Sequence, residues 1–203
     1  MKNKYNTYLR PFREDDYVLI NKWRSNYNTQ RFTGGPIRFV SLEIEREWVK
    51  SKIMNNIKEI YLAICQKEDE LMVGYISLNN IDHLNKSAEL GGYVIGEKTT
   101  NRFTVFEAVK QLMDYAFYQL NIHRVDSYCL TEHPFTPFCL RSFGYIIEGI
   151  KRDVVYKNGE YKDMFCLSVL HNEYDKLNIE GKLDIEDVYR RCLDYILESK
   201  TQK

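Results

Sequence analysis

The segment from Gly91 to Leu120 constrains the fold more than any other part of the sequence. It runs from an apolar stretch, residues 91–95, through a short polar loop into a long stretch with helical periodicity. Apolar residues recur there at spacings of 4, 3, 1, 3, 1 and 3, which place them on one face of a helix: Val105, Val109, Leu112, Met113, Ala116, Phe117 and Leu120. A strand that leads into such a helix predicts a sheet with the helix packed on it.

The junction between this strand and this helix is suited to hold a phosphate group. The first amides of a helix have no intrahelical partners, and the helix dipole favours negative charge at that end. Such loops usually carry glycines, and residues 97–104 contain none. They offer hydroxyl and amide groups and one guanidinium, from Thr99, Thr100, Asn101, Arg102 and Thr104. Whether this junction holds a phosphate without glycines is therefore the main question that the sequence raises about function.

Composition and charge narrow the class of protein. The chain has 203 residues, with 29 Lys and Arg against 29 Asp and Glu, so no overall field would draw it to nucleic acid or to an anionic membrane. No apolar run reaches the roughly 18 residues of a membrane span, and the first residues lack the apolar core of a signal peptide. The five cysteines are scattered singly, without the paired spacing of a zinc site, which is typical of a reducing compartment. We expect a cytoplasmic protein without a bound metal.

Periodicity along the rest of the chain predicts further strands and helices. Strands are expected at residues 7–12, 60–65, 71–78, 87–95, 123–130, 145–156 and 161–170, and helices at residues 13–23, 41–53, 135–142 and 183–198. Apolar content drops over residues 171–181. The sequence therefore predicts a main domain over residues 1–172 and a C-terminal helical extension over residues 173–203.

The order of these elements, together with several short strings, resembles the GNAT acyltransferase superfamily over residues 5–170. The strings that carry the resemblance are Leu9-Arg10-Pro11, Ala88-Glu89-Leu90-Gly91, Phe106-Glu107-Ala108, Tyr115-Ala116-Phe117, Asn121-Ile122-His123-Arg124-Val125, Phe143-Gly144-Tyr145, Glu148-Gly149 and Asn158-Gly159-Glu160-Tyr161-Lys162-Asp163. They are most similar to the Rim-type and polyamine N-acetyltransferase branch. The resemblance implies an α/β (α+β) GNAT fold, with a mixed, mostly antiparallel central sheet and flanking helices.

The resemblance also implies a site for acetyl-CoA as co-substrate. In the family the pantetheine lies where the fourth and fifth strands splay apart, which here implies contacts with Tyr93, Val94 and Ile95. An amide at or next to Val94 would stabilise the oxyanion that develops on the thioester carbonyl. The pyrophosphate would lie on the loop before the long helix, and the further implied cofactor residues are Thr100, Asn101, Arg102, Phe103, Thr104, Val105, His133 and Thr136.

The loop departs from the family pattern. Thr100, Phe103 and Val105 stand where the family has Arg or Gln, then Gly, then Gly or Ala. Because glycine is used where backbone approaches a ligand closely, a Phe and a β-branched Val would narrow the groove or change its path. His133 stands where the family usually has an Asn that contacts the cofactor. Two outcomes stay open here: CoA binding retained through the helix-terminus amides, or a lost or altered site.

The candidate catalytic residues follow from the same resemblance. Glu89 occupies the place of a fourth-strand carboxylate that could take the amine proton, directly or through water, although an exposed structural Glu is as common. The Tyr that donates a proton to the thiolate in many relatives is replaced by Leu140. Tyr145, Cys139 and His133 are the nearby candidates for that role, and each also suits a purely structural position.

Substrate recognition is expected from the first two helices and the last hairpin, through Trp23, Arg24, Glu89 and Tyr156. The string Trp23-Arg24-Ser25-Asn26 resembles GNAT enzymes that act on the amino sugars of nucleotide sugars, whereas the remaining strings resemble those that modify protein N-termini or polyamines. Trp23 also suits a core anchor. The tail helix is expected to pack on the domain or to form a dimer contact.

These observations lead to one main hypothesis and two rivals. The main hypothesis is an acetyl-CoA-dependent N-acetyltransferase in which a primary amine, from a small molecule or a peptide, attacks directly in a ternary complex. The first rival is a non-catalytic GNAT-fold binding or assembly protein, suggested by the altered loop and the missing Tyr. The second is a transferase with another acyl donor. Neither nucleic acid nor membrane is expected as a partner, and a homodimer is considered.

Overall fold

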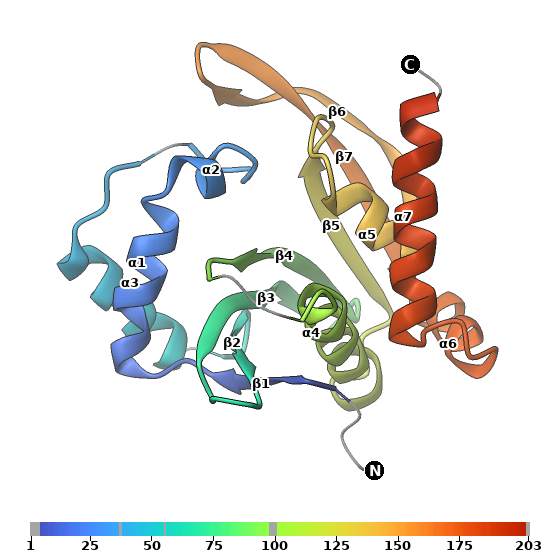
Figure 1. Ribbon diagram of the computed structural model, residues 1–203, viewed down its shortest axis with the longest axis horizontal. Helices are drawn as coiled ribbons and strands as arrows, with labels where there is room; N and C mark the ends of the chain where they lie inside the picture. Colours follow the sequence, from blue (N-terminus) through green and yellow to red (C-terminus); the bar gives the residue numbers. More distant parts are fainter. Residues whose placement is uncertain (1–4, 37, 55, 98–100, 202–203) are drawn as a thin grey trace.

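The computed structural model describes residues 5–36, 38–54, 56–97 and 101–201, and these residues build one mixed sheet with helices on both faces (Figure 1). Seven strands are ordered β1-β2-β3-β4-β5-β7-β6 within the described residues. Their bounds are β1 Thr7–Pro11, β2 Ile60–Gln66, β3 Met72–Asp82, β4 Ser87–Ile95, β5 Arg124–Leu130, β6 Ile146–Lys157 and β7 Glu160–Leu170. Neighbouring strands are antiparallel except β4 and β5, which are parallel. This confirms the mixed, mostly antiparallel sheet.

Two groups of helices cover the two faces of the sheet. The helices are α1 Tyr17–Arg24, α2 Tyr27–Gln30, α3 Leu42–Met54, α4 Thr104–Asp114, α5 Thr136–Ser142, α6 His171–Ile179 and α7 Ile185–Thr201, with a 3-10 turn at Glu14–Asp16. Alternate residues of β2 point to opposite faces. Ala63 and Cys65 join the core beneath α1 and α3, whereas Ile64 joins the larger core formed with α4, α5 and α7.

The long amphipathic helix predicted after residue 104 is confirmed. Val109, Leu112, Met113, Ala116 and Phe117 are all buried against the sheet. The helix changes character near its end, because Tyr115–Gln119 forms a π-helical turn whose last bond runs from the Leu120 amide to the Tyr115 carbonyl at 3.0 Å. This wider turn ends the helix just before β5.

Strand β4 changes its course at two glycines. β4 has one more residue than β3 between the pairs Leu78–Leu90 and Ile76–Tyr93, and Gly92 in this bulge has a φ of +94°. Pairing between β4 and β5 ends at the pair Leu90–Ser127. Beyond that point, residues 91–95 keep β3 as neighbour but have no pairing with β5. The two strands therefore diverge, and one edge of the end of β4 is left open.

The segment after β7 is helical, although its sequence predicted no helix before residue 183. In α6, Glu173 accepts a hydrogen bond from the Leu170 amide at 2.9 Å, and the buried Tyr174 donates to Asp114 on α4 at 2.9 Å. α7 places Val188 and Cys192 in the same core as α4 and the sheet. The C-terminal segment thus packs on the domain along its length.

Candidate active site

A cavity of about 980 Å³ lies where β4 and β5 diverge. One wall is the end of β4 with Val105 at the start of α4, and the facing wall is Tyr128 and Cys129 of β5 with the turn that follows. The loop after α2 and residues of β6 and β7 close the remaining sides. The cavity is therefore built from elements of both halves of the chain.

The open edge of β4 is the part of the cavity best suited to hold an extended ligand. Tyr93, Val94 and Ile95, all expected at a cofactor, line the cavity. Backbone groups of a strand point alternately to its two neighbours, so alternate amides and carbonyls of this segment face the side that β5 leaves free. Such groups can bind an amide-containing chain as a further strand does, or hold a carbonyl oxygen.

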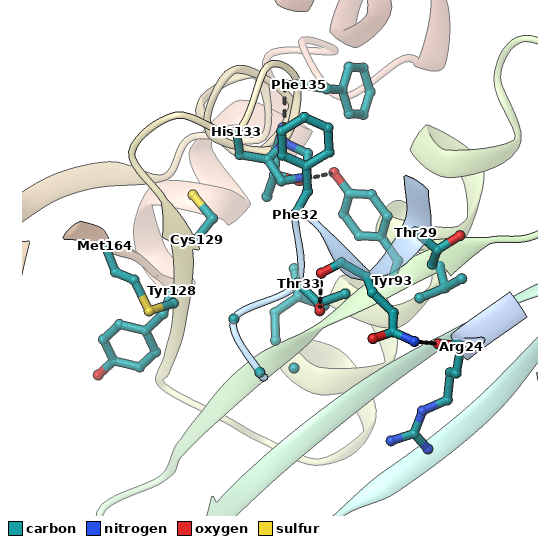
Figure 2. Close-up of a pocket in the computed structure, with 18 of the residues that line it drawn as sticks. Arg24, Thr29, Phe32, Thr33, Tyr93, Tyr128, Cys129, His133, Phe135 and Met164 are labelled. Atoms are coloured by element: carbon teal, nitrogen blue, oxygen red, sulfur yellow. Dashed lines mark hydrogen bonds between the residues drawn. The ribbon is translucent and has the colours of Figure 1, made fainter. Parts of the chain in front are cut away.

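His133 acts as a neutral hydrogen-bond acceptor at the start of α5. Its Nδ1 accepts from the amides of Phe135 at 3.2 Å and Thr136 at 3.0 Å, so the ring proton belongs on Nε2, which lies 3.1 Å from the Thr136 hydroxyl. Burial lowers the pKa of His133 to about 4. The Thr136 hydroxyl is in turn 3.3 Å from that of Tyr93, and the ring of Phe32 lies on His133 with centroids 5.1 Å apart (Figure 2).

Glu89 is the carboxylate that lines the cavity. It lies on β4 just before the bulge, is half-buried, and accepts a hydrogen bond from the Asn80 side chain at 2.9 Å. The second carboxylate oxygen has no hydrogen-bond partner among the described residues. Glu89 is therefore held in place at the fork of the two strands and still presents an acceptor, which is what a general base requires.

Arg24 reaches the cavity wall with its charge compensated. Its guanidinium donates to Glu45 at 2.7 Å and lies over the Trp48 ring at 4.6 Å. Glu45 is fully buried, and burial raises the pKa of its carboxyl despite this partner. A buried carboxylate needs a counter-ion, and Glu45 has Arg24 in this role. The ion pair holds the guanidinium in place, so the main role of Arg24 in the structure is to pair with Glu45.

Two other cations line the cavity, and the sequence had not singled them out. Lys151 of β6 lies with its ammonium 4.0 Å from the ring centroid of Tyr128. Arg38 is held through its backbone, since the Gln30 side chain accepts from its amide at 3.1 Å and donates to its carbonyl at 3.4 Å. In the part of the chain that the structure describes, neither Arg38 nor Lys151 has an ion-pair partner.

A buried lysine ties the loop after α2 to the tip of the β6–β7 hairpin. Lys157 donates to the carbonyls of Gln30 at 2.7 Å and Thr33 at 2.5 Å, and lies 3.5 Å from that of Arg31. Its side chain is 3% exposed, and burial lowers its pKa. No pattern in the sequence predicts this contact, because Lys157 precedes a polar hairpin turn.

The start of α4 faces the C-terminal helix more than the cavity. Thr100 lies outside the described residues. The Asn101 side chain forms a turn before the helix by accepting from the Phe103 amide at 2.9 Å, and its carbonyl accepts from the amide and hydroxyl of Thr104. Phe103 makes an edge contact with Tyr189 of α7 at 5.4 Å, and Arg102 lies over both rings. Of the described residues of this loop, Val105 alone lines the cavity.

Besides Asn101, Arg102, Phe103 and Thr104, three more residues expected in the site lie outside the cavity lining. Tyr145 is buried in the core, donates to the sulfur of Met113 at 3.3 Å, and has a pKa raised well above its usual range by burial. Its hydroxyl therefore faces the core side of the sheet. Trp23 is buried beneath α1, as a core anchor, with its indole N–H on Glu97 at 3.0 Å. Tyr156 is exposed and packs on Tyr161 at the hairpin surface.

The described residues contain neither a candidate metal-binding cluster nor a candidate membrane-spanning helix. Residues 5–36, 38–54, 56–97 and 101–201 bring no three His, Cys, Asp or Glu side chains together in a way that could hold a metal ion. Over the same ranges, no helix combines the length and the apolar character needed to cross a bilayer.

Comparison with known proteins identifies the family. A family model described as an acetyltransferase (GNAT) domain matches residues 6–137. The chain is 32% identical over 161 residues to p20, an uncharacterised N-acetyltransferase of Bacillus licheniformis, which covers 79% of this chain and 90% of that protein. It is 24% identical over 166 residues to a spermidine N(1)-acetyltransferase of Vibrio cholerae, with 82% and 94% covered.

Solved structures agree with this fold. The crystal structure of spermidine N-acetyltransferase from Vibrio cholerae in complex with CoA and spermine matches with a TM-score of 0.75 at 21% identity, covering 83% of this chain and 98% of that chain. At this identity the likeness concerns the fold alone. The family model and the first relative carry the assignment further: the chain belongs to the GNAT acetyltransferase family.

Proposed function

We propose that this enzyme transfers the acetyl group of acetyl-CoA to a primary amine. The observation that carries the proposal is the fork between β4 and β5, where an open strand edge and the carboxylate of Glu89 border one cavity. The open edge suits the pantetheine, whose amides can pair with it as a strand would. The carboxylate suits the amine, whose proton has to be removed before or during attack.

Each group at the fork has a role in the transfer. Glu89 accepts the proton of the ammonium group, directly or through one water, and the free amine then attacks the thioester carbonyl carbon. As the C–N bond forms and the C–S bond breaks, an amide of β4 at or next to Val94 donates to the carbonyl oxygen. A preorganised donor of this kind contributes about 10² to 10³ in rate. The nitrogen loses its second proton as the amide forms, and this proton passes through water in the cavity to the departing thiolate, which yields CoA and the N-acetylated product; Glu89 returns the first proton to solvent.

The start of α4 supplies the phosphate contacts in this proposal. Its first-turn amides and the guanidinium of Arg102, which has no ion-pair partner among the described residues, favour the pyrophosphate. Phe103 stands where the family resemblance implies a glycine, and its ring packs edge-on against Tyr189 of α7. This contact supports a cofactor groove that the large side chain does not fill. We further infer a role for His133 and Thr136 beside the pantetheine, since both line the cavity.

Two properties complete the proposal. All five cysteines are free thiols, which suits a cytoplasmic protein. Apolar side chains are exposed along the β6–β7 hairpin, at Ile146, Ile150, Tyr156 and Tyr161, and such a surface suits contact with a second copy.

The acceptor suggested by the Vibrio relative is a polyamine, and those suggested by the sequence strings also include a protein N-terminus and an amino sugar.

Calorimetric titration with acetyl-CoA tests the proposal against a non-catalytic role. We expect saturable binding by the wild-type protein, and acetyl transfer to at least one amine. In Glu89→Gln we expect kcat to fall about 10² to 10⁴-fold while acetyl-CoA still binds. Glu132→Gln serves as the control, because Glu132 pairs with Lys162 outside the cavity. No binding at millimolar acetyl-CoA would sink the enzyme proposal, and an unchanged rate in Glu89→Gln would remove Glu89 from it.

A further inference from the structure

The charges around the acceptor side of the cavity are unbalanced. Arg24 is compensated by the buried Glu45, and Glu89 is the single carboxylate among the described lining residues. Lys151 and Arg38 add two positive charges without ion-pair partners in the described chain. His133 does not add to the charge, because its pKa of about 4 keeps it neutral near pH 7. The cavity is therefore cationic before any ligand enters.

Lys151 lies on the β5 side of the fork at which the amine is proposed to react. Its ammonium covers Tyr128, and Tyr128 directly follows Ser127, the last β5 residue that pairs with β4. Glu89 is one residue before the last paired residue of β4, so the base and the ammonium flank the same fork. In Figure 2, Tyr128 and Met164 lie together on one side of the view, away from Phe135 and His133.

Arg38 belongs to a loop whose position is fixed by buried contacts. Lys157 binds the carbonyl of Gln30, and the side chain of Gln30 binds both the amide and the carbonyl of Arg38. Gln30 is 9% exposed. This chain of contacts holds the backbone of Arg38 at the cavity wall, which its exposed side chain also lines.

These cations lie apart from the part of the site suited to the CoA phosphates. In the proposed site the pyrophosphate is assigned to the start of α4 and to Arg102, whose guanidinium lies over the Phe103 ring. Lys151 and Arg38 come from β6 and from the loop after α2, which with α1 form the other sides of the cavity. A polyamine would bring several positive charges against two uncompensated cations, and like charges at short range repel.

We infer that the acceptor is a small primary amine that carries an anionic group, a carboxylate or a phosphate, which Lys151 and Arg38 bind while Glu89 receives the amine proton. This inference rests on the proposed acetyl transfer. Guanidinium and ammonium groups bind such anions through charge-assisted hydrogen bonds, which contribute more than neutral ones. The amine and the anionic group of one substrate would thus be held by groups of opposite charge.

A panel of matched amines tests the inference. Ethanolamine, O-phosphoethanolamine and β-alanine share a two-carbon amine and differ in charge, and spermidine represents the polyamines. With acetyl-CoA saturating, we expect kcat/KM for the phosphate or the carboxylate amine to exceed that for ethanolamine about tenfold or more, the size of one charge-assisted hydrogen bond. Spermidine should be the poorest acceptor. The phosphate and carboxylate arms show which anion the site prefers.

Charge-reversal variants supply the control. Lys151→Glu and Arg38→Glu should each remove the preference for the anionic amine and improve spermidine, with KM for acetyl-CoA unchanged. Arg152→Glu changes the same charge at the next residue of β6, which is exposed and outside the cavity lining, and should leave the preference intact. The preference should also weaken as salt rises.

A binding arm separates this inference from the proposed function. Calorimetry on the CoA-loaded protein should give tighter binding of O-phosphoethanolamine or β-alanine than of ethanolamine. If acetyl-CoA binds but ethanolamine or spermidine is bound and acetylated as well as the anionic amines, the inference is overturned while the transferase proposal stands. If acetyl-CoA does not bind, the transferase proposal fails first.

Discussion

At the scale of single residues, His133 uses its acceptor nitrogen within the fold. Its Nδ1 receives two amides at the start of α5, whereas the family resemblance implies an Asn at this position that contacts the cofactor. The cost is a titratable ring in a buried place. Its pKa of about 4 lies below the ordinary value of about 6.5, so protonation works against the folded state.

His133→Asn should therefore remove a pH dependence without removing the cap. In the wild type the unfolded chain binds a proton below about pH 6.5 and the folded chain only near pH 4, so stability falls as pH drops through this window. After discounting for partial exposure we expect a loss of about 2 kcal/mol relative to His133→Asn. Urea unfolding at pH 7.0, 5.5 and 4.5 measures it. Parallel pH profiles for the two proteins would contradict the assignment.

At the scale of elements, the regular pattern of the sheet and of α4 could be predicted because each has one buried face with its own period. α6 could not, since its nine residues are mostly polar, and its helix depends on distant contacts such as Tyr174 with Asp114. The wall of the site on β4 followed from the resemblance. Lys151, Arg38 and Lys157 did not, because their environment depends on how the hairpin lies over the loop after α2.

Helix α7 packs against the residues at the start of α4 that are proposed to hold the cofactor phosphates, and Tyr189→Ala tests this contact. The Tyr189 ring contacts the rings of Phe103 and Phe106, and the guanidinium of Arg102 lies over it. Removing a partly buried aromatic ring should cost about 2 to 3 kcal/mol of stability. It should also weaken acetyl-CoA binding several-fold, because Phe103 and Arg102 lose the surface that holds them.

Tyr195→Ala provides the matched control for α7. Tyr195 lies on the same helix with Arg141 of α5 over its ring at 4.3 Å, away from the cofactor loop. It should lower stability and leave acetyl-CoA affinity near that of the wild type. Calorimetry and thermal melts on both variants separate the two effects, and equal loss of affinity in both would show that α7 acts through stability alone.

At the scale of the whole molecule, the cavity is closed by a contact between opposite edges of the sheet. β1, which leads to α1 and α2, lies at one edge, and β6 lies at the other. The loop after α2 nevertheless binds Lys157 at the end of β6, more than 120 residues away in the sequence. The proposed acceptor side of the site thus depends on a residue from the C-terminal half of the chain. This residue is Lys157, whose buried ammonium binds backbone carbonyls of the loop after α2.

Lys157→Met should release this loop and expose what the contact does. The variant keeps the length of the side chain and loses every donor, so the carbonyls of Gln30 and Thr33 are left without the ammonium, at a cost of about 1 to 3 kcal/mol. Since the loop carries Arg31 and Arg38, trypsin should cut there several times faster than in the wild type. KM for the amine should rise while KM for acetyl-CoA holds, because the cofactor wall on β4 is untouched.

Two further variants decide whether the charge at residue 157 or the loss of packing is responsible. Lys157→Arg keeps a cation with several donors and should recover part of the wild-type KM and protease resistance. Lys162→Met removes a lysine from the same hairpin whose partners, Glu132 and Glu160, lie outside the cavity, and it should change neither. If Lys157→Met is cut no faster than Lys162→Met, the loop is held by its other contacts, such as Phe32 on His133, and Lys157 does not position it.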